Sequence, residues 1–371
     1  MVSAFLKWGY FTVETAVLGR LKFLLTPSPR RSGLTGVNSP RQFFIKTEDN
    51  WRLAVYHYKR SRSRRAPVLL IHGLGTNRFD LDFVDPQYSL AQYLYQRGYD
   101  VWLFEYRGAG KSYRPGILQY LKDCVQPDWI VDDIVFTDIP TMVRHVQEAT
   151  GFQKIHFIGH SLGGMLLYMV LMTMGNQVCQ SAVTLGASMN STARPGWIRL
   201  VLKLDWLLER FPLIPTKLLF RLGSPFVSWV APLEDNHFYS IKNITPSLLQ
   251  KASRYATENV PMALFMELHR WYKKGHFEAE QRDFSFHNHL KDIKTPMLVI
   301  AGSVDGITPL PDVRYAYDKI SSRDKKFVIM GTPGGYAHEY AHMDLILGTR
   351  APKEVYPQIL RWLKTHDPKE R

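Results

Sequence analysis

This 371-residue chain contains little cysteine and no long apolar run. Only two cysteines are present, Cys124 and Cys179. They cannot form a disulfide framework, and such sparse use favours a reducing compartment. No uncharged apolar run reaches about eighteen residues, which argues against an integral membrane bundle. No cysteine and histidine pattern has zinc-ligand spacing. The sequence therefore gives no indication of a zinc site.

Acidic residues are too few to balance the basic ones. The chain has 47 lysines and arginines against 33 aspartates and glutamates, a formal net charge of +14. A field of this sign attracts nucleic acid, acidic lipid headgroups or acidic substrates without choosing among them. Because no aromatic residues interleave with the basic ones in an RNA-binding pattern, nucleic acid is not an expected partner. The densest basic run, residues 59–65, lies between two strand-like segments and is predicted to be a solvated loop.

The remaining composition is that of a globular protein. Hydrophobic residues make up 45% of the chain and charged residues 22%, which excludes intrinsic disorder. A chain of 371 residues is also long enough to bury a large core.

The N-terminal 40 residues differ in sequence pattern from the rest of the chain. Residues 2–25 are mostly apolar, and in a helix Lys7, Glu14 and Lys22 would share one face. This predicts an amphipathic segment over residues 1–40. Three roles remain open for it: packing on the folded domain, lying on a membrane surface, or acting as a signal segment. With no basic n-region and no small-residue cleavage site, we expect a cytoplasmic protein, free or peripherally bound to an anionic membrane, rather than a secreted one.

Short apolar runs alternate with helical patterns from residue 41 onward. Strands are predicted at 43–46, 53–58, 68–71, 101–104, 155–158, 182–185, 297–300 and 327–330, and helices at 90–97, 129–150, 162–174, 312–320 and 354–364. Asp138 is the expected N-cap of the second part of the helical stretch 129–150. Strands that are apolar throughout, alternating with helices, predict an α/β fold with a mostly parallel sheet and helices on both faces.

One long stretch, residues 189–291, interrupts this alternation between two core strands. It is rich in tryptophan, phenylalanine and leucine. A structureless loop of that length is implausible within a compact domain, so a helical cap inserted into the sheet domain is predicted. The expected organisation is an N-terminal segment (1–40), the first part of the core (41–188), the cap (189–291) and the second part of the core (292–371).

A nucleophile motif follows one of the predicted strands. The sequence Gly159-His160-Ser161-Leu162-Gly163-Gly164 ends a strand and opens a helix, the context in which G-x-S-x-G marks a reactive serine. Such a serine stands on a sharp turn, where bulky neighbours two residues away would collide. The following helix offers unpaired N–H groups to a developing oxyanion. Ser161 is therefore the predicted nucleophile.

Serine needs a base, and the base needs an orienting acid. Asp305, in the loop after the strand at 297–300, is the predicted acid. Two histidines, His338 and His342, follow the last strand. The order Ser, Asp, His along the chain and the closeness to the last helix favour His342 as the base.

Two backbone N–H groups are the predicted oxyanion donors. One belongs to Leu162 and the other to Leu74, in the loop after the strand at 68–71. His72, in the same loop, is interpreted as a buried histidine that bonds loop carbonyls rather than as a catalytic group.

These motifs together resemble the α/β-hydrolase superfamily over residues 41–365. The resemblance rests on His72-Gly73-Leu74-Gly75, Tyr106-Arg107-Gly108-Ala109-Gly110-Lys111-Ser112, the Ser161 motif, Asp305 and His342. The tail from His342 through Asp344 and Gly348 to Tyr356-Pro357 and Trp362 is similar to the acid-lipase and polyhydroxyalkanoate-synthase-like branch. The synthases have cysteine where this chain has Ser161, which favours hydrolysis over polymerisation. The Arg-Gly-Ala-Gly turn resembles a structural loop of the family and is given no catalytic role.

The resemblance implies an α/β-hydrolase fold and hydrolysis of carboxylic esters with apolar acyl chains. The substrate would be a small ester or a lipid, and water would release the acid from an acyl-enzyme. This mechanism implies neither a metal nor an organic cofactor. Two alternatives stay open: an acyltransferase that uses the same triad, and a catalytically idle binding protein.

Overall fold

The computed structural model describes residues 39–60, 63–190, 210–224 and 238–368. Most of the predicted N-terminal amphipathic segment, and residues 191–209 and 225–237 of the predicted cap, lie outside these ranges. Among the helices in the described part of the chain, none combines the length and the apolar character needed to cross a bilayer.

Within the described residues, eight strands form one sheet in the order β1-β2-β4-β3-β5-β6-β9-β10. Their bounds are β1 Arg41–Lys46, β2 Arg52–Tyr58, β3 Val68–Ile71, β4 Val101–Glu105, β5 Ile155–His160, β6 Cys179–Leu185, β9 Met297–Gly302 and β10 Lys325–Met330. Strands β1, β2 and β4 pair antiparallel, and every pairing from β4 to β10 is parallel. The predicted mostly parallel sheet is confirmed.

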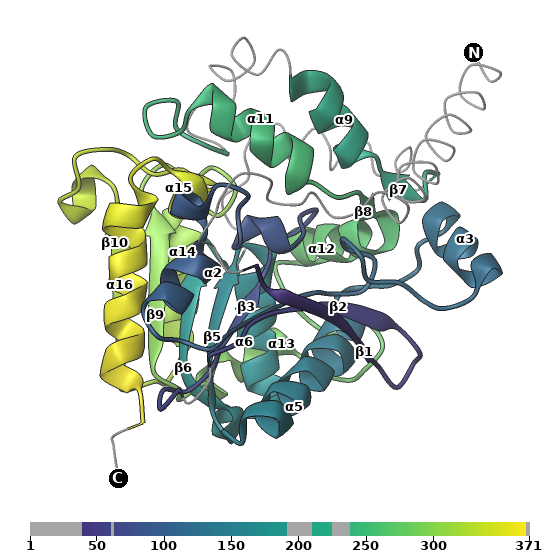
Figure 1. Ribbon diagram of the computed structural model, residues 1–371, viewed down its shortest axis with the longest axis horizontal. Helices are drawn as coiled ribbons and strands as arrows, with labels where there is room; N and C mark the ends of the chain where they lie inside the picture. The colour runs from purple at the N-terminus through teal and green to yellow at the C-terminus, as the bar shows by residue number, and fades with distance from the viewer. Residues whose placement is uncertain (1–38, 61–62, 191–209, 225–237, 369–371) are drawn as a thin grey trace.

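Helices cover both faces of the sheet, as predicted (Figure 1). Alternate residues of β3 show why its sequence is apolar throughout. Leu69 and Ile71 pack in the core that holds α5 (Ile139–Thr150) and α6 (Leu162–Met174). Val68 and Leu70 pack on the opposite face, in the core that holds α2 (Leu90–Gln96) and α16 (Ala351–His366). A strand buried on both faces leaves no position for a polar side chain.

The predicted helical stretch 129–150 differs from expectation at Asp138. A π-helical turn, Ile134–Asp138, joins the short α4 (Val131–Asp133) to α5. Asp138 is itself helical and does not cap α5 with its side chain. Its carboxylate instead forms a buried ion pair with Arg107 at 2.7 Å. A charge-assisted bond between two buried groups outweighs the weaker bond that a cap would provide. One helix that was not predicted, α3 (Ile117–Val125), follows β4.

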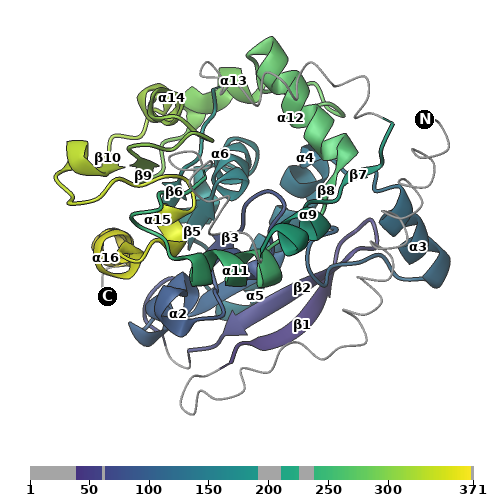
Figure 2. The same ribbon diagram turned by 90° about the horizontal axis from the view of Figure 1, so that it is seen from above.

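The stretch predicted to be a cap contains helices and a small two-stranded sheet. The elements described there are β7 Leu213–Ile214, α9 Thr216–Gly223, α11 Pro246–Tyr255, β8 Val260–Pro261, α12 Met262–Lys274 and α13 Phe286–His289. Seen from above, α11 and α9 lie over the middle of the molecule, and α12 lies beyond β8 towards one side (Figure 2). Helix α12 buries Leu264, Leu268 and Trp271 in the same core as α6. The division into core and cap remains a prediction.

Candidate active site

Ser161 occupies a strained turn between β5 and α6. Its φ of 54° and ψ of −124° make it one of two non-glycine residues with positive φ in the described part of the chain. Such a conformation costs an L-residue on the order of 1–3 kcal/mol. The flanking glycines are required by close approach. A Cβ on Gly159 would lie 2.3 Å from the Gly163 oxygen, and one on Gly163 would lie 2.2 Å from the Ile71 oxygen.

His342 lies against Ser161. Its Nε2 is 2.8 Å from Ser161 Oγ, and its Nδ1 is 2.8 Å from Asp305 Oδ2. Ser161 follows β5, Asp305 follows β9, and His342 lies between β10 and α15 (Asp344–Leu347). The structure therefore brings together the three side chains that the sequence placed far apart, in the order expected of a nucleophile, a base and an orienting acid.

The Asp305 carboxylate is fixed by bonds from its own loop. Its Oδ1 accepts from the N–H groups of Ile307 and Thr308 at 2.9 and 2.8 Å, and its Oδ2 accepts from the Thr308 hydroxyl at 2.7 Å. Asp305 and His342 are both buried. A carboxylate on the Nδ1 side favours the tautomer that carries its proton there. Nε2 is then left free to accept the Ser161 proton.

His338 lies elsewhere. Its Nε2 is 3.2 Å from Nη2 of Arg350, which can donate to it, at an exposed position. The structure thus places His342, rather than His338, beside Ser161.

The predicted oxyanion donors lie on the two segments that flank Ser161. Leu162 is the first residue of α6, where N–H groups have no acceptor within the helix. The loop that carries Leu74 packs directly on the turn, because a Cβ on Gly73 would lie 3.2 Å from Ser161 Cβ. Within this loop His72 is buried, which lowers its pKa to about 4, and its Nδ1 lies 3.0 Å from the Gly73 oxygen. His72 is therefore the buried, carbonyl-bonding histidine expected from the sequence.

A second carboxylate and imidazole pair, Asp80 and His160, lies beside the site. Asp80 Oδ2 is 3.0 Å from His160 Nδ1 and accepts the Gly73 N–H at 2.9 Å. Burial opposes both charges, but their attraction prevails: the pKa of Asp80 is lowered and that of His160 is raised. The His160 ring lies 5.0 Å from the His342 ring. The sequence contained no signal for this pair, since 80 positions separate its members.

The described residues contain no group of three or more histidine, cysteine, aspartate or glutamate side chains that could hold a metal ion.

Comparison with known proteins agrees with the fold. Residues 66–340 match the family described as alpha/beta hydrolase fold. The chain is 26% identical to Lipase 3 of Drosophila melanogaster over 87% of its own length and 89% of that protein. It is 32% identical to gastric triacylglycerol lipase of Rattus norvegicus over 33% of its length and 32% of that protein.

Two solved structures share the architecture. A monoacylglycerol lipase from Paleococcus ferrophilus aligns with a TM-score of 0.55 at 18% identity, covering 84% of this chain and 99% of that one. A thermophilic esterase from Thermogutta terrifontis aligns with a TM-score of 0.58 at 16% identity, covering 88% and 100%. The chain belongs to the alpha/beta hydrolase family. Its relatives place it among the ester hydrolases of that family, with the lipases and esterases.

Proposed function

We propose that the protein hydrolyses carboxylic esters with apolar acyl chains through an acyl-enzyme formed on Ser161. The observation that carries this proposal is the continuous line of hydrogen bonds from Ser161 through His342 to Asp305, each 2.8 Å long. The line ends on a serine held in a strained turn at the start of a helix.

In the first half of the reaction, Ser161 Oγ attacks the ester carbonyl carbon and its proton passes to His342 Nε2. Asp305 stabilises the imidazolium that forms. The carbonyl oxygen becomes an oxyanion that accepts from the N–H groups of Leu74 and Leu162. The bond to the alcohol oxygen then breaks, and His342 returns its proton to the leaving alcohol. The acyl group remains on Ser161.

In the second half, water replaces the alcohol. His342 Nε2 takes a proton from the water as its oxygen attacks the acyl carbon, and the same two N–H groups stabilise the second oxyanion. When the bond to Ser161 breaks, the proton on His342 goes to Ser161 Oγ. The products are the carboxylic acid and the free enzyme.

Apolar side chains beside the turn support an apolar acyl group. Leu74 and Ile214 pack against the buried cluster that contains Leu162 and Val260. A Cβ on Gly75 would lie 2.9 Å from Val260 Cγ2. The cap segment that contains β8 therefore packs directly on the loop that carries Leu74. Ligand pockets are mostly apolar with few polar anchors. The similarity to a triacylglycerol lipase points to the same substrate class.

The test is turnover of p-nitrophenyl esters of rising acyl length by the wild type and by Ser161→Ala. We expect medium or long chains to be cleaved faster than acetate. We expect Ser161→Ala to lose several powers of ten in kcat, since removal of a triad nucleophile costs about a million-fold. A variant that keeps more than about a tenth of wild-type turnover would exclude Ser161 as nucleophile. Product analysis with a competing alcohol separates hydrolysis from acyl transfer.

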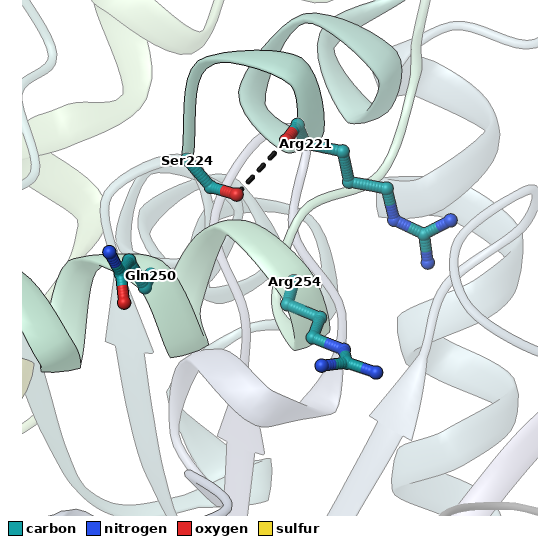
Figure 3. Close-up of a pocket in the computed structure, with 4 residues that line it drawn as sticks. All are labelled: Arg221, Ser224, Gln250 and Arg254. Carbon is teal, nitrogen blue, oxygen red and sulfur yellow. Dashed lines mark hydrogen bonds between the residues drawn. The ribbon is translucent and has the colours of Figure 1, made fainter. Parts of the chain in front are cut away.

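We propose that the protein is cytoplasmic and binds peripherally to the surface of an anionic membrane. Helix α9 exposes Leu219, Phe220 and Leu222, with exposed fractions of 52%, 48% and 64%. Arg221 of α9 and Arg254 of α11 line a cavity of about 540 Å³ together with Ser224 and Gln250 (Figure 3). Exposed apolar residues beside arginines match an anionic lipid surface in both polarity and charge. The two cysteines, Cys124 and Cys179, are buried and form no disulfide, which is consistent with a reducing compartment.

A further inference from the structure

Three hydrogen-bonding groups converge on the carbonyl oxygen of Gly73. The Tyr106 hydroxyl donates to it at 2.7 Å, the Thr76 hydroxyl donates at 2.9 Å, and His72 Nδ1 lies at 3.0 Å. A carbonyl oxygen has two lone pairs, so three donors are more than its hydrogen-bonding capacity requires. Such convergence fixes the direction of the carbonyl.

This carbonyl belongs to the peptide unit that carries the Leu74 N–H. The peptide group is planar, and no peptide bond in the described residues is cis. In a trans peptide the C=O and the N–H point in opposite directions. Any group that holds the Gly73 oxygen therefore also fixes the direction of the Leu74 N–H, which is the proposed oxyanion donor.

The loop is also held by hydrogen bonds before and after this peptide. The Gly73 N–H donates to Asp80 Oδ2 at 2.9 Å, and the same oxygen is bound to His160, the residue before Ser161. Further along the loop, the Gly75 oxygen, in the peptide that joins Gly75 to Thr76, accepts the N–H of Glu258 at 2.7 Å. Because the preceding peptide and the chain just beyond Leu74 are both anchored, rotation of the Leu74 peptide would break the bonds to the Gly73 oxygen.

Tyr106 suits this role in its surroundings. It is buried, which raises the pKa of its hydroxyl well above the ordinary range and keeps the donor proton in place. Its ring stacks on His72, with the centroids 4.0 Å apart and the planes at 21°. Burial in turn keeps His72 neutral, since it lowers the pKa of that imidazole to about 4. The two side chains hold each other in place on the Gly73 oxygen.

We propose that Tyr106 is a positioning residue for the oxyanion hole: its hydroxyl holds the Gly73 carbonyl and thereby aims the Leu74 N–H at the oxyanion formed when Ser161 attacks. The inference rests on the proposed function and extends it, because it assigns a part in catalysis to a tyrosine that does not touch the substrate. Thr76 donates to the same carbonyl from within the loop that carries Leu74.

The experiment compares Tyr106→Phe with Tyr99→Phe. The first variant deletes the hydroxyl and keeps the ring that stacks on His72. Tyr99 is the matched control because it is also a tyrosine next to β4. It precedes the strand, whereas Tyr106 follows it. Its buried hydroxyl donates to Asp367 at 2.8 Å. We expect kcat of Tyr106→Phe to fall about tenfold with little change in KM, less than the ~100- to 1,000-fold that follows loss of an oxyanion donor itself. Tyr99→Phe should keep wild-type kcat.

A second readout separates positioning from general destabilisation. An alkyl boronic acid forms a tetrahedral adduct with a reactive serine and so probes the oxyanion hole without turnover. Its inhibition constant should rise for Tyr106→Phe by the same factor as kcat/KM falls. Thr76→Val should shift both quantities in the same direction, which gives an independent variant should Tyr106→Phe fail to fold by circular dichroism.

Several results would overturn the proposal. These are a kcat of Tyr106→Phe within about twofold of wild type, an equal loss in Tyr99→Phe, or a rise in KM alone. If Tyr106→Phe does not fold and Thr76→Val keeps wild-type kcat, the proposal also fails. Wild-type enzyme that neither cleaves esters nor reacts with a fluorophosphonate would instead refute the proposed function, and with it this inference. The two failures are therefore distinguishable.

Discussion

The hydroxyl oxygen of Ser161 lies 2.8 Å from Nε2 of His342, although 181 positions separate the two residues along the chain. Strand topology produces this contact. Ser161 follows β5 and His342 comes after β10, and every pairing from β5 through β6 and β9 to β10 is parallel. Because parallel strands end at the same edge of a sheet, the residues that follow them meet there. A base can therefore be supplied to the serine by a distant loop.

The two histidines of that loop should differ in their effect on turnover. His342→Ala should be nearly inactive, because it removes the group that takes the Ser161 proton. His338→Ala should keep most of its rate, because His338 contacts Arg350 at an exposed position. Steady-state kinetics on one p-nitrophenyl ester tests both variants. Equal losses, or a loss only in His338→Ala, would contradict the assignment of the base.

Asp80→Asn should reduce both stability and activity. Breaking a buried ion pair by removing one charge costs about 3–5 kcal/mol, and this variant also weakens the anchor of the Gly73 N–H. A matched control is Asp100→Asn, which breaks the buried pair of Asp100 with His57, 2.9 Å apart, on β2. Urea unfolding should show a comparable loss of stability in both variants. Only Asp80→Asn should lower kcat, and an equal fall in kcat for both would contradict this account.

The charges of Asp80 and His160 predict how the loss of stability in Asp80→Asn depends on pH. The pKa of Asp80 is lowered, so its contribution is present above its unfolded pKa of about 3.9 and is lost as pH falls through the folded value. The pKa of His160 is raised, so its contribution is present below its unfolded pKa of about 6.5 and is lost as pH rises through the folded value. The destabilisation by Asp80→Asn should therefore be greatest near pH 5–6 and smaller at pH 9. A loss that is flat across this range would refute the ionic contribution.

Replacing Glu267 on α12 by glutamine should stabilise the folded protein. Burial raises its pKa to about 9, and its Oε2 accepts the Val131 N–H at 2.6 Å. An acid with a raised folded pKa binds its proton more tightly in the native state. Native stability therefore falls as pH rises from the unfolded value of about 4.3 towards 9. Glutamine keeps an acceptor and has no charge to bury.

The unfolding free energy of Glu267→Gln should accordingly exceed that of wild type by an amount that grows as pH rises towards the folded pKa of about 9. Urea titrations at pH 5.5, 7 and 8.5 measure this difference. A difference that is constant, or that shrinks as pH rises, would show that Glu267 is not held in its neutral form.

Binding to membranes should depend on both charge and apolar exposure. The net charge of +14 and the exposed residues of α9 predict weak association with anionic vesicles that is lost at high salt. Co-sedimentation with phosphatidylserine vesicles at low and high salt measures it. Leu219→Ser combined with Leu222→Ser should weaken binding, whereas Ile117→Ser on α3, at a more exposed position, should have less effect. Absence of binding at low salt would contradict the proposal.

The sheet and the Ser161 turn could be predicted because their signals are local. Strand β3 is apolar at every position because both of its faces are buried, and the Ser161 motif contains the glycines that its own turn requires. Asp305 and His342 could be proposed only from their order along the chain. Their contact with Ser161 depends on parallel pairing that no short segment encodes.

What the sequence did not predict depends on contacts between distant buried polar groups. Asp138 looked like a cap because it precedes Pro140, but Arg107, 31 positions away, binds its carboxylate. Asp80 ends a short 3-10 helix, Arg78–Asp80, whose sequence gives no indication of a contact with His160. The three bonds to the Gly73 oxygen come from residues on two different loops. Ion pairs and carbonyl contacts of this kind have no periodic pattern, so they become visible only once the chain is folded.

The central claim is that Ser161 is a nucleophile activated by His342, and labelling with a fluorophosphonate tests it most directly. Wild-type protein should form one covalent adduct, which peptide mapping should locate on Ser161. The rate of labelling should fall by orders of magnitude in His342→Ala and should be nearly unchanged in His338→Ala. An adduct on another residue, or no adduct on folded wild-type protein, would contradict the account.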